Sequence, residues 1–340
     1  MKICAFNHYS IFNKNNNFMN SGVYTLGTNQ HYVGQVLYDR FAEKGCELAT
    51  IDMYPLDEFD AFIFSDFPTK EKRLLRAIRQ LGKPMYLIIN EYEGSKPDNW
   101  YKKNHSYFKK IFTWAPRYVD NEKYYPIRYP VASLKLINAT SGINVETKKI
   151  CCAIWSNKRS NHKNELYSER IKVIRWFEKN AVADFCLYGY GWDQIYLPGP
   201  FWRLRKIPLV SKMTYRISYS CYQGKVDSTV EIYGRYKFAF AYENCKDTPG
   251  CISERIFDSL VNMCIPIYLG DPDVADYIPT NTFIDKRKFD NYQQLYDYLK
   301  FMLDPEYEQY LHNIHSFLNS PLIYPFTAEA FADTLISHVC

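Results

Sequence analysis

Residues 237–271 read KFAFAYENCKDTPGCISERIFDSLVNMCIPIYLGD, and this stretch decides the fold class. An apolar run ends in Glu243-Asn244, a helical pattern starts near Ser253, and a second apolar run ends in Gly270-Asp271. A helix that links two apolar strands returns the chain so that the strands lie parallel in one sheet. The stretch is therefore typical of an α/β protein.

The same alternation extends outward in both directions along the 340 residues. We expect two Rossmann-like α/β domains, residues 1–130 and 149–320. Residues 131–148 carry Ser, Thr and Asn without strong periodicity and are interpreted as a linker. Residues 321–340 have the spacing of a final helix, which we expect to pack back on the first domain. Two such domains facing each other enclose a cleft, which suits an enzyme with two substrates.

The composition narrows the class of partner. The net charge is +5 and the basic residues form no dense stripe, so a nucleic-acid partner is not expected. The 31 tyrosines suit a polar, ring-shaped ligand such as a sugar, although AT-rich codon usage explains them equally well. No run of about 18 apolar residues predicts a transmembrane helix. Contact with a membrane would be peripheral, through a lipid-linked substrate.

The ten cysteines form no CxxC pair and have no His cluster beside them, so no zinc site is predicted. Their number does not imply a disulfide framework in a chain this long, and a reducing, cytoplasmic location is the simpler expectation. The oligomeric state is left open.

Polar residues follow the apolar runs of the second domain at the points where the strands are expected to end. Because the carboxyl ends of parallel strands share one edge of a sheet, a ligand bound there would meet them first. These candidate binding residues are Ser156, Asn157, Tyr188, Gly189, Glu243 and Asn244.

Positive charge is expected near the same edge. Arg170 lies in the helix that follows Ser156-Asn157, and Arg255 lies in the first turn of the helix after Glu243-Asn244. A cation in a first turn opposes the helix dipole, which points to a compensating anion such as a phosphate. The alternative is an ordinary solvated first turn with Ser253 as its cap.

A DxD spacing occurs at Asp271-Pro272-Asp273, directly after an apolar strand and a glycine. In some enzymes that use sugar nucleotides this spacing holds a divalent cation, but here we interpret it as a turn. No metal site and no required cofactor are predicted, because two basic side chains can neutralise a diphosphate.

In the first domain, Glu91 and Glu93 follow the strongly apolar run MYLII. A carboxylate at the carboxyl end of that strand can act as a general base toward a sugar hydroxyl. A charged loop without catalytic function is the alternative, and the pattern does not choose between the two glutamates.

Residues 242–285 resemble the signature of the α1,3/4-fucosyltransferases of glycosyltransferase family 10. That family has a Glu-Asn pair, a Gly-x-Ile/Val-Ser/Thr-Glu helix start, an Ile/Val-Pro-x-Tyr-x-Gly strand and a Pro…Phe-Ile end. The matching residues are Glu243, Asn244, Gly250, Ile252, Ser253, Glu254, Ile256, Pro266, Tyr268, Gly270, Pro279 and Phe283. Upstream, WSNKRSNHKNELYSER resembles the Ser-Asn and donor-binding Arg of the family, with Arg170 as the best match.

The resemblance implies a GT-B architecture and an inverting transfer of L-fucose from GDP-fucose to a glycan hydroxyl. An α1,3 linkage to GlcNAc or Glc of a lactosamine- or lactose-type acceptor is the expected product. It further implies that Arg170 and Arg255 contact the diphosphate, that Glu254 contacts fucose or ribose, and that Glu91 is the base. The residues implied to line the nucleotide pocket are Ser156, Asn157, Glu243 and Asn244. Ser253, the expected cap of the helix, is a further candidate donor-binding residue.

Four positions depart from the family pattern: Tyr242 replaces Phe, Cys251 replaces Tyr, Arg255 replaces Lys and Leu269 replaces Trp. Cys251 leaves open a donor other than GDP-fucose. A glycan- or nucleotide-binding protein without catalysis is a further alternative. The acceptor and the linkage, whether α1,3, α1,4 or α1,2, also remain open.

Overall fold

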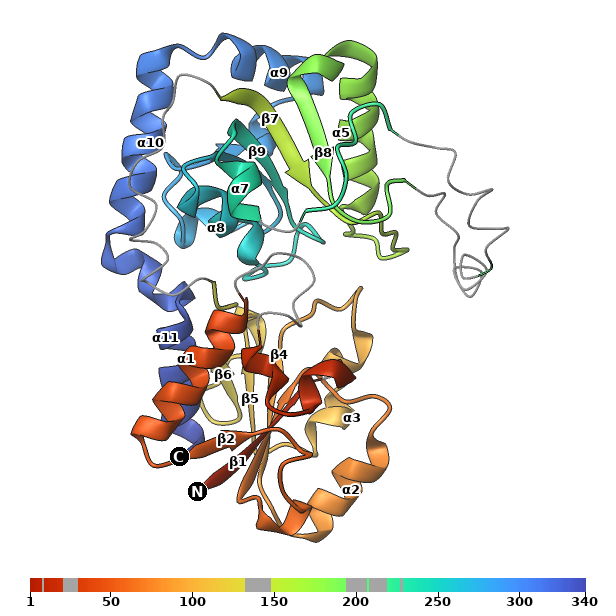
Figure 1. Ribbon diagram of the computed structural model, residues 1–340, viewed down its shortest axis with the longest axis vertical. Coiled ribbons are helices and arrows are strands. Elements are labelled where there is room, and N and C mark those ends of the chain that lie inside the picture. Colours follow the sequence, from red (N-terminus) through yellow and green to blue (C-terminus); the bar gives the residue numbers. More distant parts are fainter. Residues whose placement is uncertain (8, 21–29, 132–147, 194–206, 208–218, 227–228) are drawn as a thin grey trace. The chain divides into compact units, whose positions relative to one another are not determined.

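The computed structural model describes the whole chain (Figure 1) apart from residues 8, 21–29, 132–147, 194–206, 208–218 and 227–228. Nearly all of the expected linker, 131–148, lies outside the described residues. The chain divides into two compact units. Unit 1 contains Met1–Ala139, Thr248–Glu254 and Ser320–Cys340, and unit 2 contains Thr140–Asp247 and Arg255–Asn319.

Unit 1 is built on a six-stranded parallel sheet in the order β2-β1-β3-β4-β5-β6. Its strands are β1 (Lys2–Asn7), β2 (Glu47–Ala49), β3 (Ala61–Ser65), β4 (Met85–Ile89), β5 (Lys110–Thr113) and β6 (Tyr124–Pro126). All five residues of β4 are buried. A parallel strand covered on both faces reads as a continuous apolar run, which is why MYLII predicted it correctly.

The helices of unit 1 lie between these strands and at the C-terminus. They are α1 (Gln30–Glu43), α2 (Lys72–Gln80), α3 (Lys102–His105) and α11 (Ala328–Val339). Short 3₁₀ turns complete the unit: η1 (Ser10–Asn13), η2 (Asn17–Met19), η4 (Leu56–Glu58), η5 (Pro97–Trp100), η6 (Pro116–Tyr118) and η11 (Pro321–Phe326).

The C-terminal helix α11 packs beside α1 (Figure 1). The Thr327 hydroxyl caps it by accepting a hydrogen bond from the Ala330 N–H at 3.2 Å. Phe331 and Leu335 of α11 are buried in the same core cluster as Phe41 of α1. The last helix of the chain is therefore part of the hydrophobic core of unit 1.

Unit 2 contains a five-stranded parallel sheet in the order β11-β10-β9-β7-β8. Its strands are β7 (Lys149–Ile154), β8 (Phe185–Tyr188), β9 (Tyr236–Tyr242), β10 (Ile265–Leu269) and β11 (Ile284–Asp285). Its helices are α5 (Tyr167–Asn180), α7 (Thr229–Tyr233), α8 (Glu254–Val261), α9 (Tyr292–Phe301) and α10 (Asp304–Leu318). Its 3₁₀ turns are η7 (Val182–Asp184), η9 (Val274–Asp276) and η10 (Lys286–Lys288).

Strand β6 is the element that the sequence pattern did not predict. Its three residues, Tyr124–Pro126, include a proline and show no alternation of their own. Among the described strands, β6 lies at the edge of the sheet and pairs with β5. Proline is tolerated on such an edge, since a missing N–H on the open side removes no ladder bond.

The segment Thr248–Glu254 interrupts unit 2 in sequence and clusters with unit 1. Gly250 has a φ of +84°, and a Cβ at this position would lie 2.1 Å from the carbonyl oxygen of Trp114. Only glycine permits this conformation together with so close a backbone approach. The Pro-Gly pair before α8 thus marks a tight contact inside unit 1.

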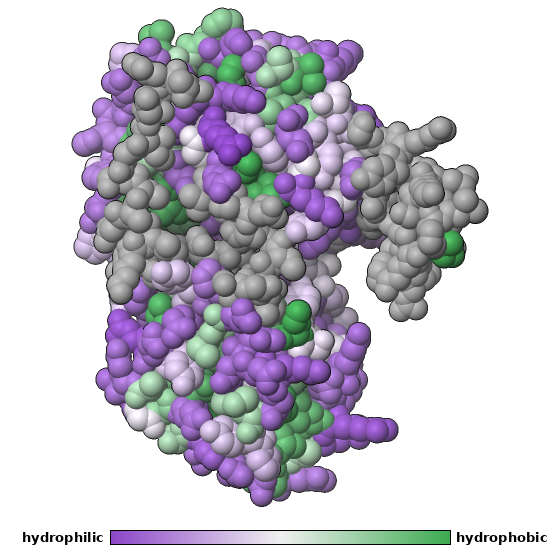
Figure 2. Space-filling model, in the orientation of Figure 1, coloured by the Kyte–Doolittle hydropathy of each residue, from purple (hydrophilic) through white to green (hydrophobic). Residues whose placement is uncertain are grey.

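The face in Figure 2 carries hydrophobic residues in small patches separated by hydrophilic ones. The large apolar side chains are instead concentrated in the buried core of each unit. Among the described helices, none combines the length and the apolar character needed to cross a membrane. All ten cysteines lie in described residues as free thiols, and eight of them are buried.

Candidate functional site: strand ends of the two sheets

The carboxyl ends of β7, β8, β9 and β10 lie at one edge of the sheet in unit 2, because all four strands are parallel. The polar pairs that follow them are therefore gathered at this edge. They are Ser156-Asn157, Tyr188-Gly189, Glu243-Asn244 and Gly270-Asp271. The structure brings together the strand-end residues that the sequence singled out.

The loops after β7 and β8 are bound to each other. The Asn157 N–H donates to the Tyr190 carbonyl at 2.8 Å, and the Asn157 side chain donates to the Gly191 carbonyl at 2.8 Å. Gly189 has a φ of +116°, and a Cβ there would lie 2.1 Å from the Trp155 carbonyl oxygen. A glycine at position 189 is thus needed for these two loops to meet.

The Tyr188 side chain packs against Tyr236. Its hydroxyl is 2.8 Å from the Tyr236 hydroxyl, and burial raises the pKa of the Tyr188 phenol. The Gly189 N–H donates to the Gly224 carbonyl at 2.9 Å. Both residues therefore shape the edge of the sheet, and the ligand contact predicted for them stays a prediction.

Arg170 lies beneath the end of β9 with only 3% of its surface exposed. Its Nη2 donates to the carbonyls of Tyr242 at 2.8 Å and Glu243 at 2.7 Å, and to Asn244 Oδ1 at 3.1 Å. The guanidinium also lies 5.5 Å from the centre of the Trp155 ring. These contacts fix the strand end that carries Glu243 and Asn244, and a contact of Arg170 with a diphosphate stays a prediction.

Arg255 lies in the first turn of α8, which begins at Glu254 directly after Ser253. Its Nη1 is 3.2 Å from Glu243 Oε2. The Glu243 side chain is 1% exposed, whereas that of Arg255 is 25% exposed. Ser253 and Glu254 are half-buried. A cation accessible to solvent is therefore held at a helix N-terminus by a buried carboxylate.

Gly270 makes room for that carboxylate. A Cβ at position 270 would lie 2.4 Å from Cγ of Glu243 and 2.7 Å from the Tyr268 hydroxyl. The glycine of the IPIYLG stretch is thus needed for close packing beside the Glu243 side chain. This contact joins the end of β10 to the end of β9.

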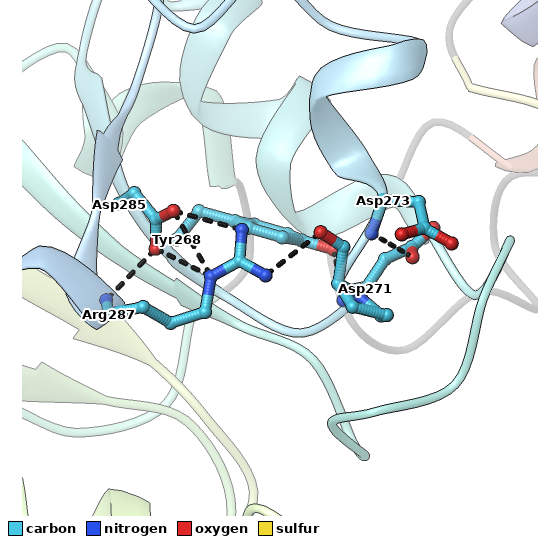
Figure 3. Close-up of polar contacts among 6 residues, drawn as sticks. Tyr268, Asp271, Asp273, Asp285 and Arg287 are labelled. Carbon is cyan, nitrogen blue, oxygen red and sulfur yellow. Dashed lines mark hydrogen bonds and ion pairs between the residues drawn. The ribbon is translucent and has the colours of Figure 1, made fainter.

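The Asp271-Pro272-Asp273 spacing forms a turn (Figure 3). Asp271 Oδ1 accepts a hydrogen bond from the Asp273 N–H at 2.9 Å, and the Asp271 N–H donates to the Tyr268 hydroxyl at 3.0 Å. Arg287 binds Asp285 through Nε and Nη2 and donates from Nη1 to the Pro272 carbonyl at 2.9 Å. Over the described residues, no three His, Cys, Asp or Glu side chains are grouped to hold a metal ion.

In unit 1, Glu91 and Glu93 lie just beyond β4, at the carboxyl edge of its sheet. Glu91 is half-buried, and its carbonyl accepts a hydrogen bond from the Trp100 indole at 3.2 Å. Glu93 is exposed. The structure therefore separates the two candidates, since the backbone of Glu91 is anchored by a buried side chain.

Sequence reasoning missed two features of these edges. Arg159 donates from Nη1 to Asn157 Oδ1 at 2.8 Å, which adds a guanidinium to the edge in unit 2. The basic pair Lys158-Arg159 after a strand end was the available signal. Asp66 accepts hydrogen bonds from the Asn90 and Glu91 N–H groups. Nothing in the local sequence connects Asp66 with Glu91.

Part of the chain is similar to known fucosyltransferases. Residues 206–318 match the model "Glycosyltransferase family 10 (fucosyltransferase) C-term". Over 72 residues the chain is 33% identical to an α-(1,3)-fucosyltransferase of Helicobacter pylori, covering 21% of this chain and 15% of that protein. Over 109 residues it is 32% identical to an α-(1,4)-fucosyltransferase of Arabidopsis thaliana, covering 31% and 26%. The matched segments are thus about a quarter or less of these relatives' length.

Solved structures share the fold at low sequence identity. An α1,3-fucosyltransferase crystallised with GDP matches with a TM-score of 0.53 and 14% identity, over 100% of this chain and 91% of that chain. An α-glucosyltransferase in complex with UDP-glucose and DNA matches with a TM-score of 0.59 and 11% identity, over 100% and 99%. These similarities show the GT-B fold of glycosyltransferases. The similarity to the C-terminal domain of glycosyltransferase family 10 covers residues 206–318 of this chain.

Proposed function

We propose that the protein transfers L-fucose from GDP-fucose to a hydroxyl group of a glycan acceptor. The observation that carries this proposal is the placement of Arg255 in the first turn of α8, inside the segment that matches the fucosyltransferase family. Two relatives that match parts of this chain are named as fucosyltransferases. In this proposal unit 2 binds the donor and unit 1 supplies the base.

Donor binding follows from the charge at the start of α8. Cleavage of the fucosyl–phosphate bond leaves negative charge on the GDP diphosphate, which a guanidinium and the positive end of a helix dipole stabilise. The Arg255 side chain is 25% exposed, so it can meet a ligand while it remains paired with Glu243. We propose Glu254 as a contact of fucose or ribose, and Ser156, Asn157, Glu243 and Asn244 as the lining of the nucleotide pocket.

The proposed reaction is a single displacement with inversion at the anomeric carbon. The acceptor hydroxyl attacks that carbon, the bond to the diphosphate breaks, and Glu91 takes the hydroxyl proton. No nucleophile of the enzyme is needed. We also propose that no divalent metal takes part, because Asp271 Oδ1 is engaged in its own turn and Arg255 supplies positive charge.

The acceptor is proposed to be GlcNAc or Glc in a lactosamine- or lactose-type glycan, linked α1,3. The relatives differ here: the names of two specify α-(1,3) and α-(1,4) transfer. A third, from Gallus gallus, is a GDP-fucose protein O-fucosyltransferase and is 35% identical over 86 residues, which are 24% of this chain and 18% of that protein. The acceptor test must therefore include peptides as well as glycans.

The test is transfer from labelled GDP-fucose to N-acetyllactosamine, lactose, a small glycan panel and a Ser/Thr-rich peptide, with and without EDTA. Transfer to one glycan that survives EDTA is the expected result, and NMR of the product gives linkage and configuration. If no acceptor is fucosylated and calorimetry detects no GDP-fucose binding, the proposal is wrong.

Cys251 favours a second candidate, the same reaction with another nucleotide sugar. It is half-buried three residues before α8, where the family pattern has Tyr. Competition among GDP-fucose, GDP-mannose and UDP-glucose separates the two candidates. Tighter binding of GDP-mannose or UDP-glucose than of GDP-fucose would select the second.

A further inference from the structure

The dipeptide Asn90-Glu91 is held by side chains on all four of its backbone hydrogen-bonding groups. Both N–H groups donate to Asp66 Oδ1, at 2.8 Å from Asn90 and 3.2 Å from Glu91. The Asn90 carbonyl accepts from the Trp114 indole at 3.0 Å, and the Glu91 carbonyl accepts from the Trp100 indole at 3.2 Å. β4 ends at Ile89, so side chains, and not a neighbouring strand, bind the backbone of the two residues that follow it.

Asp66 occupies an unusual backbone conformation to make these contacts. It follows β3 directly, is 1% exposed and has a φ of +63°. Aspartate is one of the few residues that adopts this left-handed region, yet it remains uncommon there. Asn99 adds a further hydrogen bond, from Nδ2 to Asp66 Oδ1 at 2.5 Å. Three N–H donors thus converge on one buried carboxylate oxygen.

A second layer fixes Asn99. Its Oδ1 accepts from the Phe67 N–H at 2.7 Å, and its carbonyl lies 2.7 Å from His105 Nε2. His105 Nδ1 lies 2.9 Å from the Tyr124 hydroxyl of β6. Burial lowers the pKa of His105, which favours the neutral ring that donates from one nitrogen and accepts at the other. The Asp66–Asn99 pair is therefore connected through His105 to Tyr124 of β6, by hydrogen bonds.

We propose that Asp66 is a positioning residue that aims the Glu91 carboxylate. The inference rests on the proposed role of Glu91 as the base. With both N–H groups and both carbonyls bound, the φ and ψ angles of Glu91 are restricted, and so is the direction of its Cα–Cβ bond. A base pre-oriented in this way spends less of its time in unproductive geometries, which raises kcat rather than donor affinity.

The test compares Asp66→Gly with Asp66→Asn. Glycine adopts a φ of +63° without strain but removes the acceptor oxygen, whereas asparagine keeps an oxygen at the same place. We expect Asp66→Gly to lower kcat by roughly 10- to 100-fold with a GDP-fucose KM within about threefold of wild type. Asp66→Asn should retain most of the kcat that Asp66→Gly loses. Asp98→Ala is the matched control, because it removes only a side-chain bond from the Thr69 hydroxyl, 2.7 Å long.

Two readouts separate positioning from a general loss of structure. Hydrogen exchange of the Asn90 and Glu91 amides should accelerate in Asp66→Gly while the amides of β1 and β5 stay protected, and this needs no substrate. In a Glu91→Gln background, Asp66→Gly should lower kcat by less than about twofold, because positioning acts through Glu91. The inference would be overturned if hydrogen exchange at these two amides is unchanged in Asp66→Gly. It would also be overturned if Asp66→Gly lowers kcat as much in the Glu91→Gln background as in wild type.

A second variant covers poor folding of Asp66→Gly. Trp100→Phe keeps an aromatic ring and removes the indole donor to the Glu91 carbonyl, although its ring is smaller. A smaller fall in kcat with the same dependence on Glu91 is expected. Failure of this inference is distinct from failure of the proposed function. If Glu91→Gln lowers kcat while the Asp66 and Trp100 variants do not, Glu91 remains the base and positioning by Asp66 is wrong.

Discussion

Arg255 and Glu243 form an ion pair, 3.2 Å between Nη1 and Oε2, that joins the first turn of α8 to the end of β9. A guanidinium in a first turn opposes the helix dipole, and the buried carboxylate offsets that repulsion. Glu243, one of the protein's own side chains, is thus an anion of the kind that the sequence pattern indicated beside Arg255. A diphosphate bound at this helix start would be the second anion on the same arginine.

Removal of the Arg255 guanidinium should weaken donor binding. Arg255→Ala is expected to raise the Kd for GDP-fucose roughly 10- to 100-fold, since a hydrogen bond to a charged group contributes about 1.5–3 kcal/mol. Calorimetry measures the change. Arg175→Ala is the control, because Arg175 is another arginine of unit 2 in an ion pair with a glutamate, Glu178, at 2.9 Å. Equal Kd values for wild type and Arg255→Ala would contradict the diphosphate contact.

The two glutamates after β4 should behave differently. Glu91→Gln is expected to lower kcat by about 10²- to 10⁴-fold, the usual contribution of a general base, with GDP-fucose affinity unchanged. Glu93→Gln is the matched control, since Glu93 is exposed and two positions further along. Steady-state kinetics with saturating acceptor decides the matter. A larger effect at Glu93 would reverse the assignment, and full activity of both variants would remove it.

The glycines at positions 189 and 224 offer a test of the loop contact in unit 2. Their φ angles are similar, +116° and +112°, but a Cβ would lie 2.1 Å from the Trp155 carbonyl at Gly189 and meets no described atom within 4 Å at Gly224. Backbone strain of about 1–3 kcal/mol applies to alanine at either site. Gly189→Ala should reduce the free energy of unfolding by roughly 2 kcal/mol more than Gly224→Ala, because the clash adds to the strain. Urea denaturation gives both values, and equal losses would contradict the contact.

The stability of unit 1 should depend on pH through His338 of α11. Its ring lies 3.9 Å from that of Tyr125, and burial together with the nearby Lys110 ammonium lowers the pKa of His338 below its ordinary value of 6.5. A lowered pKa in the folded state means that the unfolded state binds the proton more tightly. The stability is therefore fully present above pH 6.5 and decreases as pH falls toward the folded pKa.

His338→Phe keeps the ring contact and removes this titration. Thermal unfolding between pH 7.5 and 5.5 should show a smaller decrease in Tm for the variant than for wild type. Aspartates and glutamates contribute little in this range, because their ordinary pKa values lie near 4. An equal decrease in both proteins would show that His338 does not contribute.

Local pattern was sufficient for most of the fold. The apolar runs at Met85–Ile89 and Ile265–Leu269 became buried parallel strands, and the helix predicted near Ser253 begins at Glu254. A strand buried on both faces appears as a short apolar run, and a helix start appears as a capping residue before a helical pattern. Both patterns span only a few residues, so they can be recognised in a single sequence. β6 has no such pattern, because it has only three residues and includes a proline. It forms a strand through its pairing with β5, which the local sequence does not show.

For the site, the sequence by itself determined which residue types stand at the strand ends and that Arg255 begins a helix. Only the tertiary structure decided which groups meet: Glu243 with Arg255, Arg170 beneath β9, and Asp66 with the backbone of Glu91. These contacts join residues that are 12, 73 and 25 positions apart in the chain, and they depend on how helices and strand ends pack and on the φ angle of Asp66. Strand ends follow from local hydrophobic pattern, whereas partners across a sheet follow from how separate strands align, and no local pattern encodes that alignment.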